Sequence, residues 1–488
     1  MWGGIPASSG GMNTFATKPR SVPELDPDFQ PAVLWNRAYL ASVKDGVPLL
    51  LALEGELGRV SRYGTVVRPG GDAETLRYVE RLVKFLLWSR GGWRLVVAGP
   101  AEIAGFLATT YAPGGARAFD AEMMEKSYGR AFTVDPVTFP EVPAEREAGA
   151  VVGGHLDGCR IGFDLGASDY KVAAVKDGQV VYSDEFAWDP RPQTDPSYHY
   201  DHLNAGLRAA AAHLPRVDAI GGSSAGVIVN NRFMVASLLR NVKPERMEEA
   251  RGMFERLRAE WGVPLEVAND GDVTALAGAL SLEENAVLGV AMGSSEAAGY
   301  LNPEGRMTGW LSELAFAPVD YNPGAPADEW SGDRGVGALY FSQQAVNKLI
   351  PAAGIPVPPE MSLPERLRLV QFLMGQDDPR AVAIYRTIGI YLGYTVAHYA
   401  EFYQFNHLLI LGRVTTGKGG NIILSTAQEV LADEFPELAL RVKVQLPDEK
   451  SRRVGQACAA ASLPALSGLA AASWRVLGSD SRLFGNPE

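Results

Sequence analysis

The most constraining feature of this sequence is an order of elements that begins at Cys159. An apolar strand, CRIGFDLG, turns directly into a second strand, YKVAAVKDG, and a third, QVVYSDEF. A helix over 202–212 and the strand VDAIGGSS follow. Helices and apolar strands then alternate as far as a helix expected after Gly420. Because strands that alternate with helices form layered sheets, the order predicts an α/β fold.

The chain is long enough for more than one domain. Its 488 residues exceed the roughly 250–300 at which a single hydrophobic core stops growing. A Pro/Glu/Ala-rich segment, TFPEVPAEREAGA, marks a boundary near residue 150. We therefore expect a flexible Gly/Ser-rich tail over 1–20, a small α/β domain of unassigned role over 21–150, and a larger α/β region over 151–488.

The expected N-terminal domain has an element order of its own. Two short strands within 47–68, a helix over 73–89 and the strand RLVVAG follow the order β-β-α-β. A similar order follows Cys159, so the segment is either a degenerate copy of the later one or an unrelated arrangement. No chemical motif repeats with it, and both interpretations stay open.

Charge and cysteine content narrow the classes of function. A net charge of −12 and a pI near 5.2 argue against a general nucleic-acid or membrane-surface binder, because phosphate neutralisation needs clustered Lys and Arg. Cys159 and Cys458 are the only cysteines, which excludes a disulfide framework and a multi-cysteine metal cluster. The opening residues lack the apolar core of a signal peptide, and no apolar run reaches the roughly 18 residues of a membrane span. These features predict a cytoplasmic protein.

The first candidate site is the turn after the strand CRIGFDLG. Gly166 and its small neighbours would let backbone N–H groups approach a phosphate, Ser168 can donate a hydroxyl, and Asp164 can hold Mg²⁺ or its water shell. An ordinary β-hairpin with a polar tip explains the same residues.

The second candidate site is the segment VANDGD, where an apolar strand meets the helix VTALAGAL. A carboxylate at the end of a strand can accept a hydroxyl proton, as phosphoryl transfer to an alcohol requires, and Asp270 is the candidate base. Helix capping is the alternative. We expect Asp272 to be the N-cap, which would explain one of the two acidic residues.

Small residues after the strand AVLGVAMG predict a second phosphate loop that includes Gly293 and Ser294. Glu296 lies within this loop and would oppose a phosphate if its side chain pointed towards it.

A Gly-rich run, LGRVTTGKGG, follows the strand HLLILG and precedes a helix. Its glycines, such as Gly412, allow a close approach, while Arg413 and Lys418 favour an anion such as a nucleotide phosphate. It is not a Walker A loop, because no Ser or Thr follows Lys418 to reach Mg²⁺.

Taken in order, these segments resemble the ROK family of sugar kinases and regulators, within the larger actin, hexokinase and heat-shock ATPase fold. The resemblance spans about 159–463. IGFDLGAS is similar to the first phosphate motif, VANDGDVTALAGAL to the catalytic strand and helix, GGSSAGVI to the small-residue loop near the sugar, and LGYTVAHYAEFYQFNHLLILGRVTTG to the helix, strand and adenosine loop.

The resemblance implies a two-lobed actin-like ATPase (ribonuclease H-like) fold, with ATP and Mg²⁺ as cofactors. It implies that Asp270 is the catalytic base, and it implies further contacts in three groups. Sugar contacts are Asn269, Glu313 and Gly226; phosphate and Mg²⁺ contacts are Asp164, Gly166, Ser168, Gly293 and Ser294; adenosine-loop contacts are Gly412 and Arg413.

The chain departs from the family pattern at several positions. Phe316 replaces a histidine, and Ala338 replaces a second sugar-binding glutamate. None of the usual zinc ligands is present, and 214–397 contains no His or Cys, so we expect no structural zinc. We expect packing of Trp330, Val336 and Tyr340 to hold 328–337 instead. Small residues other than glycine occupy the second phosphate loop at Ser295, Ala297 and Ala298.

Three functions are compatible with these observations. The first is an ATP-dependent kinase that phosphorylates a hydroxyl of a sugar or sugar-like compound. The second is a non-catalytic protein that binds a small ligand or a partner through the same cleft. The third, a transcription regulator, would need a basic DNA-reading helix-turn-helix, which residues 1–150 do not suggest. We expect a sugar-like molecule and a nucleotide as ligands, no nucleic acid and no membrane. A homo-oligomer remains open.

Overall fold

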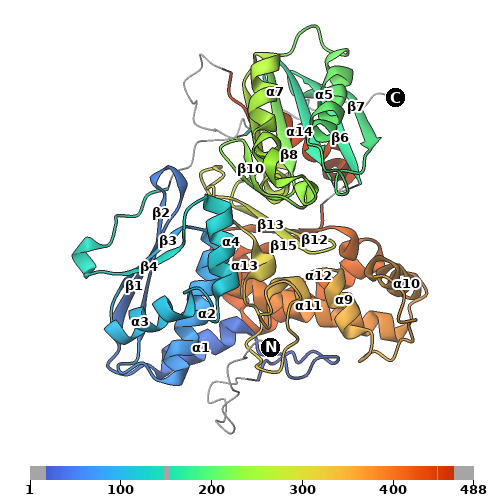
Figure 1. Cartoon of the computed structure of the whole chain (residues 1–488). Helices are drawn as coiled ribbons and strands as arrows, with labels where there is room; N and C mark the ends of the chain where they lie inside the picture. The colour runs from blue at the N-terminus through green and yellow to red at the C-terminus, as the bar shows by residue number, and fades with distance from the viewer. Residues whose placement is uncertain (1–17, 148–152, 167, 448, 467–488) are drawn as a thin grey trace.

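The structure is a computed structural model that describes residues 18–147, 153–166, 168–447 and 449–466. Most of the predicted tail and the predicted boundary near residue 150 lie outside the described residues. The described chain forms two lobes, each built on its own sheet, and an N-terminal region, residues 18–147, with a third sheet (Figure 1).

The first lobe, at the top of Figure 1, contains a five-stranded sheet in the order β11-β8-β5-β6-β7. β5, β6 and β7 are antiparallel to one another in turn, while β8 and β11 run parallel to β5. The main core of the lobe lies between the sheet and its helices, around Phe163, Leu207 and Phe254. The elements are β5 (Cys159–Leu165), β6 (Asp169–Lys176), β7 (Gln179–Ala187), α5 (Ser197–Ala211), β8 (Ala219–Ser224), β9 (Val227–Val229), β10 (Arg232–Val235), α6 (Met247–Arg251), α7 (Met253–Trp261), β11 (Leu265–Asn269) and, from the C-terminal end of the described chain, α14 (Glu449–Ala461), which packs on β5, β6 and β8.

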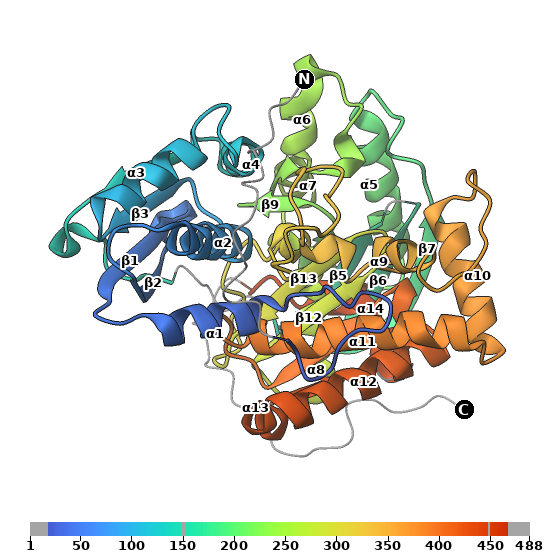
Figure 2. The ribbon, with the colours of Figure 1, turned by 90° about the horizontal axis from the view of Figure 1, so that it is seen from below.

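The second lobe contains a four-stranded sheet in the order β13-β12-β14-β15. β13 is antiparallel to β12, whereas β14 is parallel to both β12 and β15. Figure 2 shows the long helices α11 and α12 side by side along this lobe. The elements are α8 (Asp270–Leu282), β12 (Val287–Met292), β13 (Glu296–Leu301), α9 (Gln343–Leu349), α10 (Leu363–Gly375), α11 (Pro379–Tyr399), β14 (His407–Leu411), α12 (Lys418–Glu434), α13 (Pro436–Arg441) and β15 (Lys443–Gln445).

The two sheets share one topology. In each, a first strand pairs with an antiparallel hairpin partner on one side and with parallel strands on the other, and the second sheet lacks only the third hairpin strand. This repeated order is that of a two-lobed ribonuclease H-like fold. The predicted fold class is therefore confirmed.

The N-terminal region is built differently. Its sheet has the order β2-β1-β3-β4, and β3 runs antiparallel to β1, whereas β8 runs parallel to β5. The interpretation of this region as a degenerate copy of the later segment is therefore wrong. The elements are α1 (Ala32–Ser42), β1 (Val47–Glu54), β2 (Val60–Val67), α2 (Ala73–Arg90), β3 (Arg94–Ala98), α3 (Ala101–Thr110), α4 (Ala118–Tyr128) and β4 (Thr133–Pro136).

The N-terminal region shares its hydrophobic core with the second lobe. The ring of Phe85 on α2 lies 4.2 Å from that of Phe402, and the ring of Phe29 lies 4.7 Å from that of Tyr391 on α11. One continuous cluster of buried residues joins both parts. That 21–150 and 151–488 are separate domains stays a prediction.

Segment 328–337 differs from its predicted packing. Val336 and Tyr340 are buried, but Trp330 is 68% exposed, so the prediction that Trp330 packs here is wrong. The Asp328 carboxylate accepts hydrogen bonds from the Trp330 and Ser331 N–H groups, which fixes the turn. Asp333 instead holds the segment to the N-terminal region through a buried ion-pair network described below.

Among the described helices, none combines the length and apolar character needed to cross a membrane.

Candidate active site between the lobes

The candidate base lies where β11 ends and α8 begins. Asn269 caps α8, because its Oδ1 accepts a hydrogen bond of 2.8 Å from the Gly271 N–H, while its Nδ2 donates one of 2.9 Å to the Gly226 carbonyl. The prediction that Asp272 is the N-cap of α8 is therefore wrong. The Asp272 Oδ1 instead accepts a hydrogen bond of 3.2 Å from the Tyr300 N–H. Asn269 and Gly226 are thus joined at the end of the strand.

Asp270 is the first residue of α8. Burial raises the pKa of its carboxyl group, and a hydrogen bond of 3.0 Å from the Gly271 N–H opposes that rise. The positive end of the helix dipole also favours a carboxylate at this position. Asp270 therefore lies at a half-buried helix start, where its carboxyl group is a stronger base than an ordinary aspartate.

Asp270 interacts electrostatically with two other predicted site residues. Burial raises the pKa of Asp164 to about 6, and the charge of Asp270 adds to the rise, while a 2.7 Å hydrogen bond from Ser223 opposes it. Burial raises the pKa of Glu313 to about 7, with further contributions from Asp270 and Asp272. The predicted base, Asp270, is thus within interaction range of both the predicted Mg²⁺-side acid, Asp164, and the predicted sugar-side acid, Glu313, which come from different lobes.

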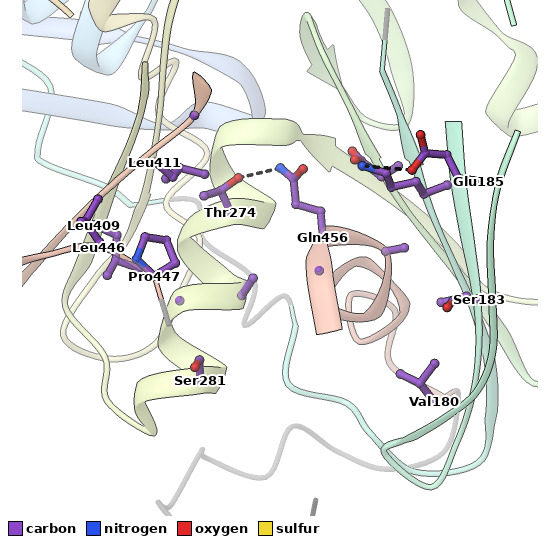
Figure 3. Close-up of a pocket in the computed structure, with 18 of the residues that line it drawn as sticks. Val180, Ser183, Glu185, Thr274, Ser281, Leu409, Leu411, Leu446, Pro447 and Gln456 are labelled. Atoms are coloured by element: carbon purple, nitrogen blue, oxygen red, sulfur yellow. Dashed lines mark hydrogen bonds and ion pairs between the residues drawn. The ribbon is translucent and has the colours of Figure 1, made fainter. Parts of the chain in front are cut away.

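A cavity of about 980 Å³ lies between the lobes; of these acids Asp164 lines it, whereas Asp270 and Glu313 do not. Figure 3 shows Leu409, Leu411, Leu446 and Pro447 of the second lobe on one side, and Val180, Ser183 and Glu185 of β7 on the other. Helices α8 and α14 contribute Thr274, Ser281 and Gln456 between them. Asp164 and Lys171, which face each other across β5 and β6, also line the cavity.

Of the predicted nucleotide contacts, Asp164 and Gly412 line this cavity. Gly412 has a φ of +97°, and a Cβ there would lie 2.6 Å from the Met292 carbonyl oxygen, so the loop approaches β12 as only glycine allows. Arg413 is exposed and does not line the cavity. Lys418 pairs with Asp377 at 2.8 Å.

The two predicted phosphate turns are closed by their own hydrogen bonds. The Gly166 N–H donates to the Asp169 carbonyl at 3.0 Å, and the Ser168 hydroxyl donates to the Asp169 carboxylate at 2.9 Å. In the second turn the Gly293 N–H donates to the Ser295 carbonyl at 3.0 Å. Ser168 and Ser294 are exposed, and none of these glycines and serines lines the cavity.

Glu296 does not point out of the second phosphate turn. Its side chain is 3% exposed, and its Oε1 accepts a hydrogen bond of 3.1 Å from the Tyr399 hydroxyl inside the second lobe. Burial raises the pKa of this carboxyl group to about 8. The Glu296 carboxyl group therefore points into the core. It does not point towards a phosphate in this turn, which was the condition for the expected repulsion.

Two contacts of the site were not predicted. Gln456 on α14 donates hydrogen bonds to the Asp270 carbonyl and to the Thr274 hydroxyl oxygen, at 2.9 and 2.6 Å. The Glu313 N–H donates a bond of 3.0 Å to the Trp88 carbonyl at the end of α2. No local pattern marks either contact, because the partners lie 186 and 225 residues apart.

The described residues contain no preformed site of three or more metal-ligating side chains, whether His, Cys, Asp or Glu. A cation here would therefore depend on ligands from a bound substrate as well as on the protein.

The chain matches no protein-family model and no curated protein. Among solved structures it is similar to a ROK-family glucokinase from Streptomyces griseus in complex with glucose and AMPPNP, with 17% identity and a TM-score of 0.47 over 63% of this chain and 99% of that one. It is also similar to a ROK hexokinase from Thermus thermophilus, with 17% identity and a TM-score of 0.49 over 62% and 97%. A ROK-family transcriptional regulator, a homologue of the E. coli MLC protein, has 18% identity and a TM-score of 0.48 over 62% and 78%. These are proteins of the family that the sequence resembles.

Proposed function

We propose that this protein is an ATP-dependent kinase that transfers a phosphoryl group to a hydroxyl of a sugar or sugar-like substrate. The observation that supports this most directly is the position of Asp270. Its carboxyl group interacts with Asp164, which lines the interlobe cavity from the first lobe, and with Glu313 of the second lobe. A base between a nucleotide site and an acceptor site is what transfer to an alcohol requires.

The proposed reaction needs one proton acceptor. Asp270 takes the proton of the acceptor hydroxyl while the hydroxyl oxygen forms a bond to the terminal phosphorus of ATP and the bond from that phosphorus to ADP breaks. Glu313 accepts a hydrogen bond from a second hydroxyl of the acceptor. Asn269 orients the acceptor side by holding the Gly226 loop, and its second amide N–H can meet a hydroxyl.

The interlobe cavity is the proposed nucleotide site. Gly412, Thr415 and Gln445 line it on the second lobe, and the loop that carries Gly412 lies directly against β12. Asp164 would hold Mg²⁺ or its water shell, with the remaining ligands coming from phosphates and water. When bound, Mg²⁺ would neutralise charge on the phosphates.

A non-catalytic ligand-binding protein is the second candidate. It is favoured by the two phosphate turns, in which the Gly166 and Gly293 N–H groups are already used inside the turn. Fewer backbone donors would then be available for a phosphate. We infer a cytoplasmic location for either function, since Cys159 and Cys458 are both buried free thiols.

The decisive experiment compares wild type with Asp270→Asn. ADP release is measured with a panel of hexoses, amino sugars and polyols, and ATP affinity is measured in parallel. We expect Asp270→Asn to keep the fold and ATP binding and to lose roughly 10²–10⁴-fold in turnover, because an amide cannot accept the proton. Asp377→Asn, at an exposed ion pair with Lys418, is the matched control and should keep full activity.

Three outcomes separate the candidates. Acceptor-dependent turnover that survives in Asp270→Asn would reject Asp270 as the base. Wild type that binds ATP but phosphorylates no acceptor would favour the non-catalytic candidate. Wild type that binds no nucleotide would reject the kinase proposal altogether.

A further inference from the structure

Three aromatic side chains meet beside Glu313. The ring of Phe316 packs against Trp88 with centroids 4.4 Å apart, and against Phe119 at 5.7 Å. Trp88 belongs to α2 and Phe119 to α4, so two of the three come from the N-terminal region. Trp88 is buried, whereas Phe119 and Phe316 keep part of their surface exposed.

Backbone hydrogen bonds connect this cluster to the proposed acceptor site. The N–H groups of Leu311, Ser312 and Glu313 donate to the carbonyls of Arg90, Ser89 and Trp88, at 3.2, 3.0 and 3.0 Å. The last turn of α2 therefore sets the position of Glu313. The Phe316 N–H donates to the Glu313 carbonyl at 3.2 Å, which closes a 3₁₀ turn (η5, Leu314–Phe316). Glu313 is therefore joined to Phe316 through this turn and to Trp88 through its own N–H group.

The cluster has little hydrogen-bonding capacity of its own. The Trp88 indole N–H donates to Asp120 at 2.8 Å inside the N-terminal region, and phenyl rings offer neither donor nor acceptor. A hydroxyl placed against Phe316 and Phe119 would lose water without gaining a partner. An apolar group placed there would be stabilised by burial.

The N-terminal region also reaches the first lobe. Helix α4, whose first turn contains Phe119, contacts β9 and β10, and Figure 1 shows α4 below β10. β9 begins directly after Gly226, the residue bound by Asn269. The region therefore extends along the acceptor side of the site from the second lobe to the first.

We propose that the N-terminal region forms a wall of the acceptor site, and that Phe316 and Phe119 determine specificity for acceptors with an apolar group next to the Glu313 contact. The chemical class is a sugar-like compound whose position beside Phe316 is deoxygenated, O-alkylated or N-acylated. This inference rests on the proposed kinase function and names the acceptor class for that same site.

The test uses pairs of acceptors that differ at one position: a hexose against its deoxy, O-methyl and N-acetyl derivatives at each carbon. For wild type we expect at least one apolar derivative to exceed its parent hexose about 10- to 100-fold in kcat/KM, the range that one apolar group in a pocket provides. Phe119→Ala should reduce this preference several-fold through the KM of the acceptor, with the KM of ATP within twofold of wild type. Phe316→Tyr keeps the ring, adds a hydrogen-bonding group, and should shift the preference towards the parent hexose. Phe139→Ala, an exposed phenylalanine of the same region, is the control and should match wild type.

Dissociation constants measured by calorimetry with the same acceptor pairs separate this inference from the kinase proposal. Turnover without any preference for an apolar derivative, or a preference unchanged in both Phe119→Ala and Phe316→Tyr, would overturn the inference and leave the kinase function standing. If acceptors bind without turnover, the kinase proposal is wrong, and the ratio of dissociation constants decides the inference in the same way. If no acceptor binds, both are overturned.

Discussion

The side-chain amide of Gln456 donates a hydrogen bond of 2.9 Å to the backbone carbonyl of Asp270, and one of 2.6 Å to the hydroxyl oxygen of Thr274. The Thr274 hydroxyl in turn donates to the same Asp270 carbonyl at 2.8 Å. The first turn of α8 is thus fixed by α14, the helix that packs on β5 and β8 of the first lobe. The position of the proposed base therefore depends on a contact between the two lobes.

We predict that Gln456→Ala lowers kcat by about tenfold with little change in the melting temperature. Loss of the amide leaves the Asp270 carbonyl with the Thr274 hydroxyl as its remaining side-chain donor, and a small displacement of a reacting group is costly in rate. Gln428→Ala removes a comparable amide-to-carbonyl bond, to Val444, and should leave kcat unchanged. Gln456→Glu cannot donate this bond when ionised and should resemble Gln456→Ala. Equal kcat in wild type and both Gln456 variants would contradict the role.

Glu296 predicts a pH dependence of stability. Burial raises the pKa of its carboxyl group from 4.5 to about 8. Between these values the folded state holds more protons than the unfolded state, so the free energy of unfolding falls as pH rises through this window and this contribution levels off above it. Glu296→Gln removes the titrating group. Between pH 5 and pH 9 the variant should therefore gain at least about 1 kcal/mol relative to wild type.

The measurement is chemical denaturation of both proteins at pH 5, 7 and 9. Glu304→Gln, at an exposed position, is the control and should follow wild type at every pH. A constant difference in stability between Glu296→Gln and wild type across this range would mean that Glu296 does not titrate as described.

Asp333 is predicted to anchor segment 328–337. Its carboxylate lies 3.0 Å from Arg81, 2.8 Å from Arg117 and 3.4 Å from Lys84, and Arg81 is the largest of the charges that lower its pKa against the effect of burial. Asp333→Asn would leave these buried cations with less countercharge, and we expect a loss of about 3 kcal/mol in the free energy of unfolding. Trp330→Ala, on the same segment but exposed, should change it by less than about 0.5 kcal/mol. If Trp330→Ala lowered the melting temperature more than Asp333→Asn does, aromatic packing and not the ion pairs would hold segment 328–337.

Sequence reasoning succeeded where local patterns decide the structure. The apolar runs predict the strand that carries Asp164 and the strand that leads into Asp270; Asp164 lies near the end of β5, and Asp270 follows β11 as the first residue of α8. It failed where several residues compete for one role. Asn269 and Asp272 can both cap a helix. Hydrogen bonds to residues distant in sequence, from Asn269 to Gly226 and from Tyr300 to Asp272, determine that Asn269 is the cap of α8.

Long-range contacts set the rest of the site. Nothing near Glu313 in the sequence shows that Trp88 holds its backbone, and nothing near Asp333 shows its three cationic partners. Trp330 was expected to be buried because it is large and apolar, but the turn held by Asp328 leaves it at the surface. Such contacts depend on the folding of the N-terminal region against the second lobe.

Helix α14 lies so close to the sheet of the first lobe that position 221 is predicted to require glycine. Gly221 pairs with Gly162 across β8 and β5, and a Cβ on Gly221 would lie 1.7 Å from the Ala460 carbonyl oxygen of α14. Because this neighbour is backbone, it cannot rotate away, so Gly221→Ala must displace the helix. We expect the free energy of unfolding to fall by about 1–3 kcal/mol or more. Turnover should fall as well, since α14 carries Gln456.

Gly105→Ala provides the matched control. Gly105 lies within α3, and a Cβ at this position would extend into open space. Alanine has the higher helix propensity, so this variant should gain up to about 1 kcal/mol and keep wild-type turnover. Denaturation and ADP release measured on both variants test the argument. If Gly221→Ala matched wild type in both assays, α14 would not need to lie directly on β5 and β8, and its control over the position of Asp270 would have to be abandoned.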